Sequence, residues 1–154
     1  MIRIASENEI LNSFRELDRS EVEFPENLQV PLLLKDYLAW TEPSGYRVFL
    51  VFNDPVKNVP MGVVFHRGAA TGASPPMMCE FCHSVRSGDG VMMLTAAASS
   101  RRRVGLSLCR DLNCKAKIEA SAPGAHDFFE SATPREKVQR LVRRMAVFSR
   151  QNLF

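Results

Sequence analysis

Four cysteines are the residues of this 154-residue chain whose types and spacing best suit chemistry. Cys79 and Cys82 are separated by two residues, Cys109 and Cys114 by four, and twenty-six residues lie between the two pairs. Two short-spaced pairs can hold the four corners of a tetrahedron around one Zn²⁺, with Zn–S distances of about 2.3 Å. Four sulfur ligands leave no position for a water molecule. The spacing therefore predicts one structural, non-hydrolytic zinc ion.

The sequence gives less support to other roles for these four thiols. The N-terminus, "MIRIASENEI", lacks the basic and then apolar segments of an export signal, so we expect a cytoplasmic protein whose thiols stay reduced rather than form disulfides. A redox dithiol begins a helix, whereas "GDG" soon after Cys82 breaks one. His83 could replace one sulfur, although a histidine beside a zinc turn more often supports the ligands from outside. A thiol enzyme is the least favoured hypothesis.

Little else in the sequence indicates catalysis. Asp111, inside the second pair, is expected to accept hydrogen bonds from that turn or to cap a helix. His66 and His126 have no partner visible in the sequence and are expected to be inert. Phosphate-binding, dinucleotide-binding, nucleophile-elbow and HExxH motifs are missing, so we expect neither an enzyme nor a small-molecule substrate. Three nearby cations could offset the charge of four thiolates: Arg86, Arg110 and Lys115.

Strand pairs should position the cysteines. The β-branched and aromatic segments 46–52 ("YRVFLVF") and 59–66 ("VPMGVVFH") predict an antiparallel hairpin. Residues 67–76 are predicted to connect the hairpin to the cysteine-bearing part of the chain. Segments 91–95 ("VMMLT") and 104–108 ("VGLSL") predict two more strands, and the second leads directly to Cys109.

Four helices are expected. "SENE" forms a capping box in which Ser6 accepts from Glu9 N–H and Glu9 reaches back to Ser6, before a helix with Ile10, Leu11, Phe14 and Leu17 on one face. Residues 30–40 ("VPLLLKDYLAW") offer a second helix and "CRDLNCKAKIEA" a short third one. The last, 134–152, opens at "TPRE" with Thr133 as its cap. Its apolar stripe is formed by Val138, Leu141, Val142, Met145 and Phe148.

Composition fits one globular domain over residues 1–154, since 45% of residues are hydrophobic and 24% charged. No apolar run is long enough for a membrane helix. Residues 1–100 carry 8 basic and 12 acidic side chains, and residues 101–154 carry 12 and 5. The basic surplus of the last third favours a polyanion or an acidic protein face as partner.

Three linked segments, "CEFCHSVRSGDGVMMLTA", "VGLSLCRDLNC" and "EKVQRLVRRMAVF", together resemble the zinc-finger domain of the elongation-factor-G-binding proteins of the FusB type. "DYLAWTEPSGYRVFLVF" is also similar to the segment before the finger in stand-alone actinobacterial members. The resemblance implies an α+β fold of small antiparallel sheets and flanking helices with a treble-clef-like four-cysteine finger. The finger would span about 77–124, followed by helix 134–152.

The resemblance further implies a non-enzymatic zinc protein that binds elongation factor G and modulates its release from the ribosome, as fusidic acid resistance proteins do. We expect the partner surface at the following residues: Met93, Arg101, Arg102, Arg103, Lys115, Arg140 and Arg144. Two departures from the family pattern stand out. Relatives tend to have an aromatic residue where Ser107 stands, and the resistance proteins add an N-terminal helical bundle. The alternative is a zinc-dependent module that binds RNA or the ribosome through its arginines.

Overall fold

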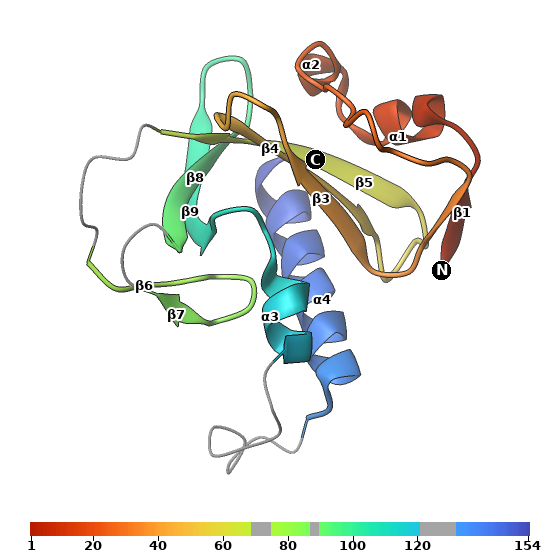
Figure 1. The fold of residues 1–154 in the computed structure, drawn as a ribbon. Coiled ribbons are helices and arrows are strands. Elements are labelled where there is room, and N and C mark those ends of the chain that lie inside the picture. The colour runs from red at the N-terminus through yellow and green to blue at the C-terminus, as the bar shows by residue number, and fades with distance from the viewer. Residues whose placement is uncertain (69–74, 87–89, 121–131) are drawn as a thin grey trace.

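A five-stranded antiparallel sheet with strand order β3-β4-β5-β8-β9 forms the centre of the fold (Figure 1). The computed structural model describes residues 1–68, 75–86, 90–120 and 132–154. The five strands are β3 (Tyr37–Thr41), β4 (Arg47–Asn53), β5 (Pro60–Arg67), β8 (Val91–Ala97) and β9 (Arg103–Cys109). Two smaller ribbons pair β1 (Ile2–Ile4) with β2 (Leu32–Leu34) and β6 (Met77–Met78) with β7 (Val85–Arg86). The helices are α1 (Glu7–Ser13), α2 (Glu16–Arg19), α3 (Cys114–Ala120) and α4 (Pro134–Asn152). This arrangement confirms the expected α+β class.

Strand β4 shows why the sheet is covered on both faces. Successive side chains of a strand point to opposite faces, and every residue from Val48 to Asn53 is buried. Val48, Leu50 and Phe52 belong to the core beneath α4, and Phe49 and Val51 to a second core beneath the N-terminal segment. The predicted hairpin is confirmed, because β4 and β5 pair antiparallel from Arg47↔His66 to Asn53↔Pro60.

Helix α4 packs along one face of the sheet, behind it in Figure 1. Its start matches the prediction, since the Thr133 hydroxyl accepts from the Glu136 N–H at 3.2 Å and Pro134 occupies the first turn. The predicted stripe is buried at four positions, Val138, Leu141, Val142 and Met145, and half-buried at Phe148. The prediction for this helix is therefore confirmed.

The N-terminal segment covers the opposite face over β4 and β5. Ser6 caps α1 by accepting from Glu9 N–H, but the Glu9 carboxylate accepts from Ala5 N–H at 2.9 Å, not from Ser6. The helix ends at Ser13, one residue before the buried Phe14. Leu17 lies in the separate helix α2 and is 48% exposed, so its predicted place on the α1 face is wrong.

The helix predicted at residues 30–40 is also wrong, because this segment forms β2 and β3. Its bulky apolar residues do not mark a single helical face. Tyr37 and Ala39 pack against the core beneath α4, while Leu38 and Trp40 pack against the second core. Pairing of β3 with β4, from Tyr37↔Phe52 to Thr41↔Val48, satisfies the backbone of the segment and overrides its helical propensity.

The strands that lead to the cysteines occur as expected. Strands β8 and β9 pair antiparallel from Val91↔Cys109 to Ala97↔Arg103. The short helix expected within residues 109–120 is α3, which begins only at Cys114. Most of the expected connector at 67–76 lies outside the described residues, as does His126. Within the ranges that the structure describes, no helix is long and apolar enough to cross a membrane.

Candidate metal centre

Two tight turns present the four cysteines. In the first, which joins β6 to β7, Cys79 N–H donates to Ser84 O at 2.9 Å and His83 N–H donates to Cys79 O at 2.8 Å. His83 adopts a φ of 63°, a left-handed conformation that lets the chain reverse within a few residues. Its side chain is exposed. It does not belong to the cluster of metal-binding side chains found in the described residues, so sulfur is not replaced by imidazole here.

The second turn connects the end of β9 to the start of α3. Leu112 adopts a φ of 53°, and its N–H donates to Cys109 O at 3.0 Å. The turn thus returns the chain, so that Cys109 at the end of a strand and Cys114 at the start of a helix face the first pair. The sequence prediction that this pair converges on the first is confirmed by the sulfur geometry.

The four sulfurs fit one tetrahedral ion. Cys79 Sγ lies 3.8 Å from Cys114 Sγ, and Cys82 Sγ lies 3.5 Å from Cys109 Sγ. All four sulfurs lie within 4.8 Å of one another. A tetrahedron with Zn–S bonds of about 2.3 Å has S–S edges of about 3.8 Å. The four cysteines are therefore positioned to bind one zinc ion, with every coordination position taken by sulfur.

Burial by itself opposes a charged sulfur, but hydrogen bonds and a nearby cation favour a thiolate at Cys109. Three of the cysteines are fully buried and Cys82 is half-buried. Hydrogen bonds from Cys114 and Cys79 lower the pKa of the Cys109 thiol to about 6. A deprotonated sulfur is the form that binds a metal. The Lys117 ammonium, at 3.3 Å from Cys109 Sγ, offsets part of the negative charge.

Lys117, which contacts Cys109 Sγ, was not among the three cations that we expected near the sulfurs. The Lys115 ammonium instead forms an ion pair with Asp36 at 2.8 Å. Lys117 was missed because its contact depends on the rotation of α3 about its axis. A helix that begins at Cys114 brings a lysine three residues later onto the same side.

Two residues far from the cysteines in sequence hold the second turn. The Tyr37 hydroxyl donates to Leu112 O at 2.7 Å and accepts from Lys115 N–H at 2.8 Å. Burial raises the pKa of Tyr37 well above its usual value, so the hydroxyl stays protonated. Buried Arg67 donates to Arg110 O at 3.1 Å and to Asp111 Oδ1 at 3.2 Å. Thr41 also donates to Asp111, so this carboxylate joins the turn to β3 and β5 rather than capping α3.

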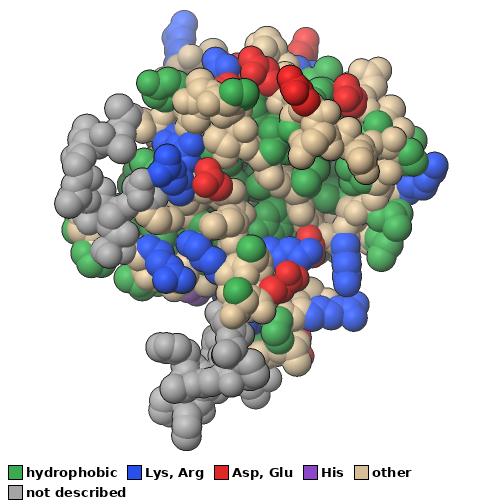
Figure 2. Space-filling view, in the orientation of Figure 1, with side chains coloured by type: hydrophobic (Ala, Val, Ile, Leu, Met, Phe, Trp, Pro, Cys, Tyr) green, Lys and Arg blue, Asp and Glu red, His purple; other side chains and the backbone are tan. Residues whose placement is uncertain are grey.

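The predicted partner residues lie on several elements. Met93 is exposed on β8, and Arg101 and Arg102 are exposed in the β8–β9 turn. The Arg103 side chain already has partners, because it donates to Thr95 Oγ1 and contacts His66 Nδ1. In the view of Figure 2, Lys and Arg side chains gather on the lower half of the molecule, around α3, and Asp and Glu side chains gather at the top, near α1 and α2.

Two of the remaining predicted residues lie on α4. Arg140 is exposed, whereas half-buried Arg144 donates to Phe81 O at 2.6 Å and so holds the first cysteine turn. Lys115 is half-buried on α3. The seven residues thus come from β8, the β8–β9 turn, β9, α3 and α4.

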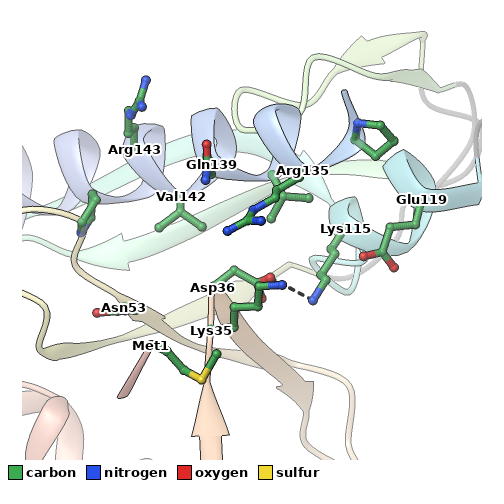
Figure 3. A pocket seen from close by; sticks show the side chains of 13 residues that line it. Met1, Lys35, Asp36, Asn53, Lys115, Glu119, Arg135, Gln139, Val142 and Arg143 are labelled. Carbon is green, nitrogen blue, oxygen red and sulfur yellow. Dashed lines mark ion pairs between the residues drawn. The ribbon is translucent and has the colours of Figure 1, made fainter. Parts of the chain in front are cut away.

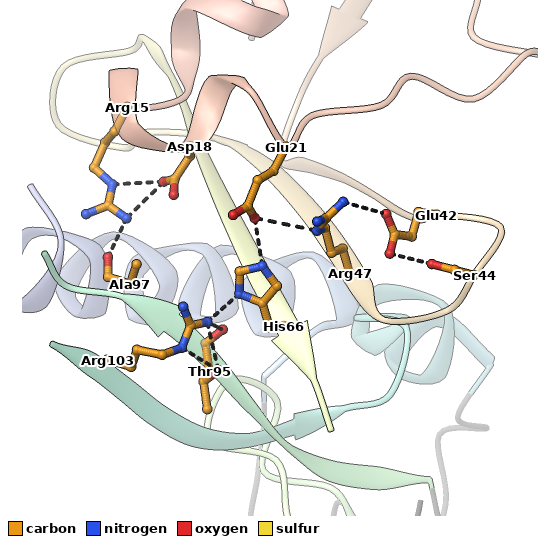
Figure 4. A network of polar contacts seen from close by, with 10 residues as sticks. All are labelled: Arg15, Asp18, Glu21, Glu42, Ser44, Arg47, His66, Thr95, Ala97 and Arg103. Atoms are coloured by element: carbon orange, nitrogen blue, oxygen red, sulfur yellow. Dashed lines mark hydrogen bonds and ion pairs between the residues drawn. The ribbon is translucent and has the colours of Figure 1, made fainter. Parts of the chain in front are cut away.

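His66 has partners that the sequence did not reveal. Its Nε2 lies 2.7 Å from Glu21 Oε2, and Arg103 contacts its Nδ1 (Figure 4). Glu21 also forms an ion pair with Arg47 at 3.6 Å. This network lies on the sheet face away from α4 and joins the N-terminal segment to β4, β5 and β9.

A protein-family comparison agrees with a zinc-finger site. The family model "FBP C-terminal treble-clef zinc-finger" matches residues 9–151. A solved structure titled "Structure of the fusidic acid resistance protein FusC" is similar at 14% identity and a TM-score of 0.48, covering 71% of this chain and 48% of that one. This chain thus spans about half the length of that protein. A search of curated proteins found no match. The resemblance seen in the sequence is confirmed, and the chain belongs to the FBP C-terminal treble-clef zinc-finger family.

Proposed function

We propose that this chain is a non-enzymatic zinc protein that binds elongation factor G and modulates its release from the ribosome. The observation that carries the proposal is the match of the zinc-finger family over residues 9–151, together with four cysteines that converge on one ion. The closed sulfur site supports a structural role for the metal, because it leaves no position for a reacting water. The zinc then orders the turns on which a docking surface is built.

The surface that we propose for docking, the knuckle face, consists of Met78, Val85, Met93, Arg101 and Arg102. Met78, Val85 and Met93 are 48%, 60% and 51% exposed. Met78 and Val85 lie opposite each other in the β6–β7 ribbon, beside β8. Exposed apolar side chains are typical of a protein interface, and the arginines of the β8–β9 turn would suit an acidic partner.

The position of Ser107 supports this choice. The family resemblance implies an aromatic residue at this position, and aromatic side chains often anchor interfaces. Ser107 lies directly opposite Met93 in the β8–β9 pair, and both face away from α4. In this chain Met93 therefore offers the apolar area on that part of the sheet. We propose it as the anchor of the docking surface.

The test is retention of purified elongation factor G by the immobilised, zinc-loaded protein. We expect binding that is lost after zinc removal and is weakened about tenfold or more by Met93→Glu. Val56→Glu is the matched control, because Val56 is 77% exposed in the β4–β5 turn and lies outside the knuckle face. No retention of the factor by the zinc-loaded protein would contradict the proposal. Retention that disappears after nuclease treatment would indicate the RNA-binding alternative instead.

A further inference from the structure

A cavity of about 530 Å³ lies between α3, the first half of α4 and the turn that joins β2 to β3 (Figure 3). Its floor includes Val138 and Val142 of α4, each only 6% exposed. Its walls carry charged side chains from all three elements. These include Lys35, Lys115, Glu119 and Arg135. The cavity contains none of the four cysteines and none of the knuckle face.

Three cations point into this space. Figure 3 shows the Lys35, Lys115 and Arg135 side chains directed toward one another. The side chain of Arg143, which lies on α4 like Arg135, points away from them. Lys115 is paired with Asp36 at 2.8 Å. Lys35 and Arg135 have no hydrogen-bond or ion-pair partner among the residues that the structure describes. The positive charges of these two side chains are therefore not neutralised by any described residue at the cavity.

The acidic side chains do not cancel this charge. Asp36 already interacts with Lys115 and accepts from Tyr37 N–H at 2.6 Å. Glu119 contributes one negative charge, whereas Lys35 and Arg135 together contribute two positive charges. Pro134 and Arg135 also form the first turn of the 19-residue helix α4, whose N-terminal end is electropositive. The electrostatic field in the cavity therefore favours an anion.

We propose that this cavity binds a small amphipathic anion. Its oxyanion, a carboxylate or a phosphate, is held by Lys35 and Arg135, and its apolar body lies against Val138 and Val142. The volume falls within the range of about 300–1,000 Å³ that is typical of small-molecule sites. An apolar floor beneath a few convergent polar groups is the usual composition of such a site. Binding here does not depend on the proposed interaction with elongation factor G.

The test uses 8-anilinonaphthalene-1-sulfonate, a fluorescent anion with an apolar body, titrated into the zinc-loaded protein. We expect saturable binding that the double variant Lys35→Gln/Arg135→Gln weakens about tenfold or more, because both charged contacts are lost. Arg140→Gln is the matched control, since Arg140 is an exposed cation of the same helix α4 and does not line the cavity. Circular dichroism and zinc content verify that each variant is folded.

Competition then identifies the oxyanion. Displacement of the dye by dodecanoate but not by AMP assigns a carboxylate, and the reverse assigns a phosphate. Failure of both to displace the dye would overturn the proposal. The proposal is also overturned if the double variant binds the dye as tightly as the unmodified protein, or if Arg140→Gln weakens binding as much as the double variant does.

Discussion

The Tyr37 hydroxyl donates to the backbone carbonyl of Leu112 at 2.7 Å, and so links the edge strand β3 to the turn between Cys109 and Cys114. The same hydroxyl accepts from the N–H that follows Cys114 in the chain. A residue outside the expected finger portion therefore fixes the backbone on either side of a metal ligand. The metal centre and the central sheet share these polar contacts.

Replacing Tyr37 with Phe should weaken zinc binding while leaving the aromatic ring in the core. The ring remains, but Leu112 O and Lys115 N–H lose their partner, which costs about 1–3 kcal/mol for an unsatisfied buried group. We expect a weaker hold on zinc, by about tenfold, as is common for residues that support metal ligands from outside. Competition with a zinc chelator measures this. Tyr46→Phe is the control, since Tyr46 is 60% exposed, and an equal effect of both changes would contradict the role of Tyr37.

Arg144→Met should destabilise the first cysteine turn. The change keeps an unbranched side chain on α4 but removes the donor to Phe81 O, and Phe81 lies between Cys79 and Cys82. Hydrogen bonds from charged groups contribute about 1.5–3 kcal/mol, so the free energy of unfolding should fall by that order. Urea denaturation of the zinc-loaded protein measures it. Arg140→Met, at an exposed position one turn earlier, should change stability by no more than about 0.5 kcal/mol.

Gly62→Ala should be far more costly than Gly105→Ala. At Gly62 an added Cβ would lie 2.7 Å from the ring of Phe14, which is buried and packed edge-on against Trp40 and Phe49. Because this ring has no room to move, we expect a loss of about 1–3 kcal/mol from overpacking.

At Gly105 the nearest atom to the new Cβ would be Met93 Sδ, at 3.1 Å, and that side chain is half exposed and can turn aside, while Thr95 Cγ2 at 3.6 Å would be in ordinary contact. The melting temperatures of the two variants, measured by thermal unfolding, test this difference. A melting temperature for Gly62→Ala equal to that of Gly105→Ala would show that Phe14 is not held tightly against β5.

The predictable parts of the structure depend on local signals. The capping residues Ser6 and Thr133, the strands that lead to Cys109 and the paired cysteines are all specified within a few neighbouring residues. Strand β3 was missed because Leu and Ala suit a helix, and pairing with β4 makes the segment a strand. The roles of Tyr37 and Arg67 were missed for a related reason. Their contacts depend on how distant elements pack, and no spacing within the sequence encodes that.

The contacts of His66 in the network of Figure 4 should place an imidazole proton on Nε2 rather than on Nδ1. A guanidinium can only donate, so the contact of Arg103 with Nδ1 requires a lone pair there. The Nε2–H then donates to Glu21 Oε2 at 2.7 Å. Long-range ¹H–¹⁵N correlation spectra of the imidazole distinguish the two tautomers. A proton found on Nδ1 would contradict the network, while Arg101→Gln, in the exposed turn, should leave the ring signals of His66 unchanged.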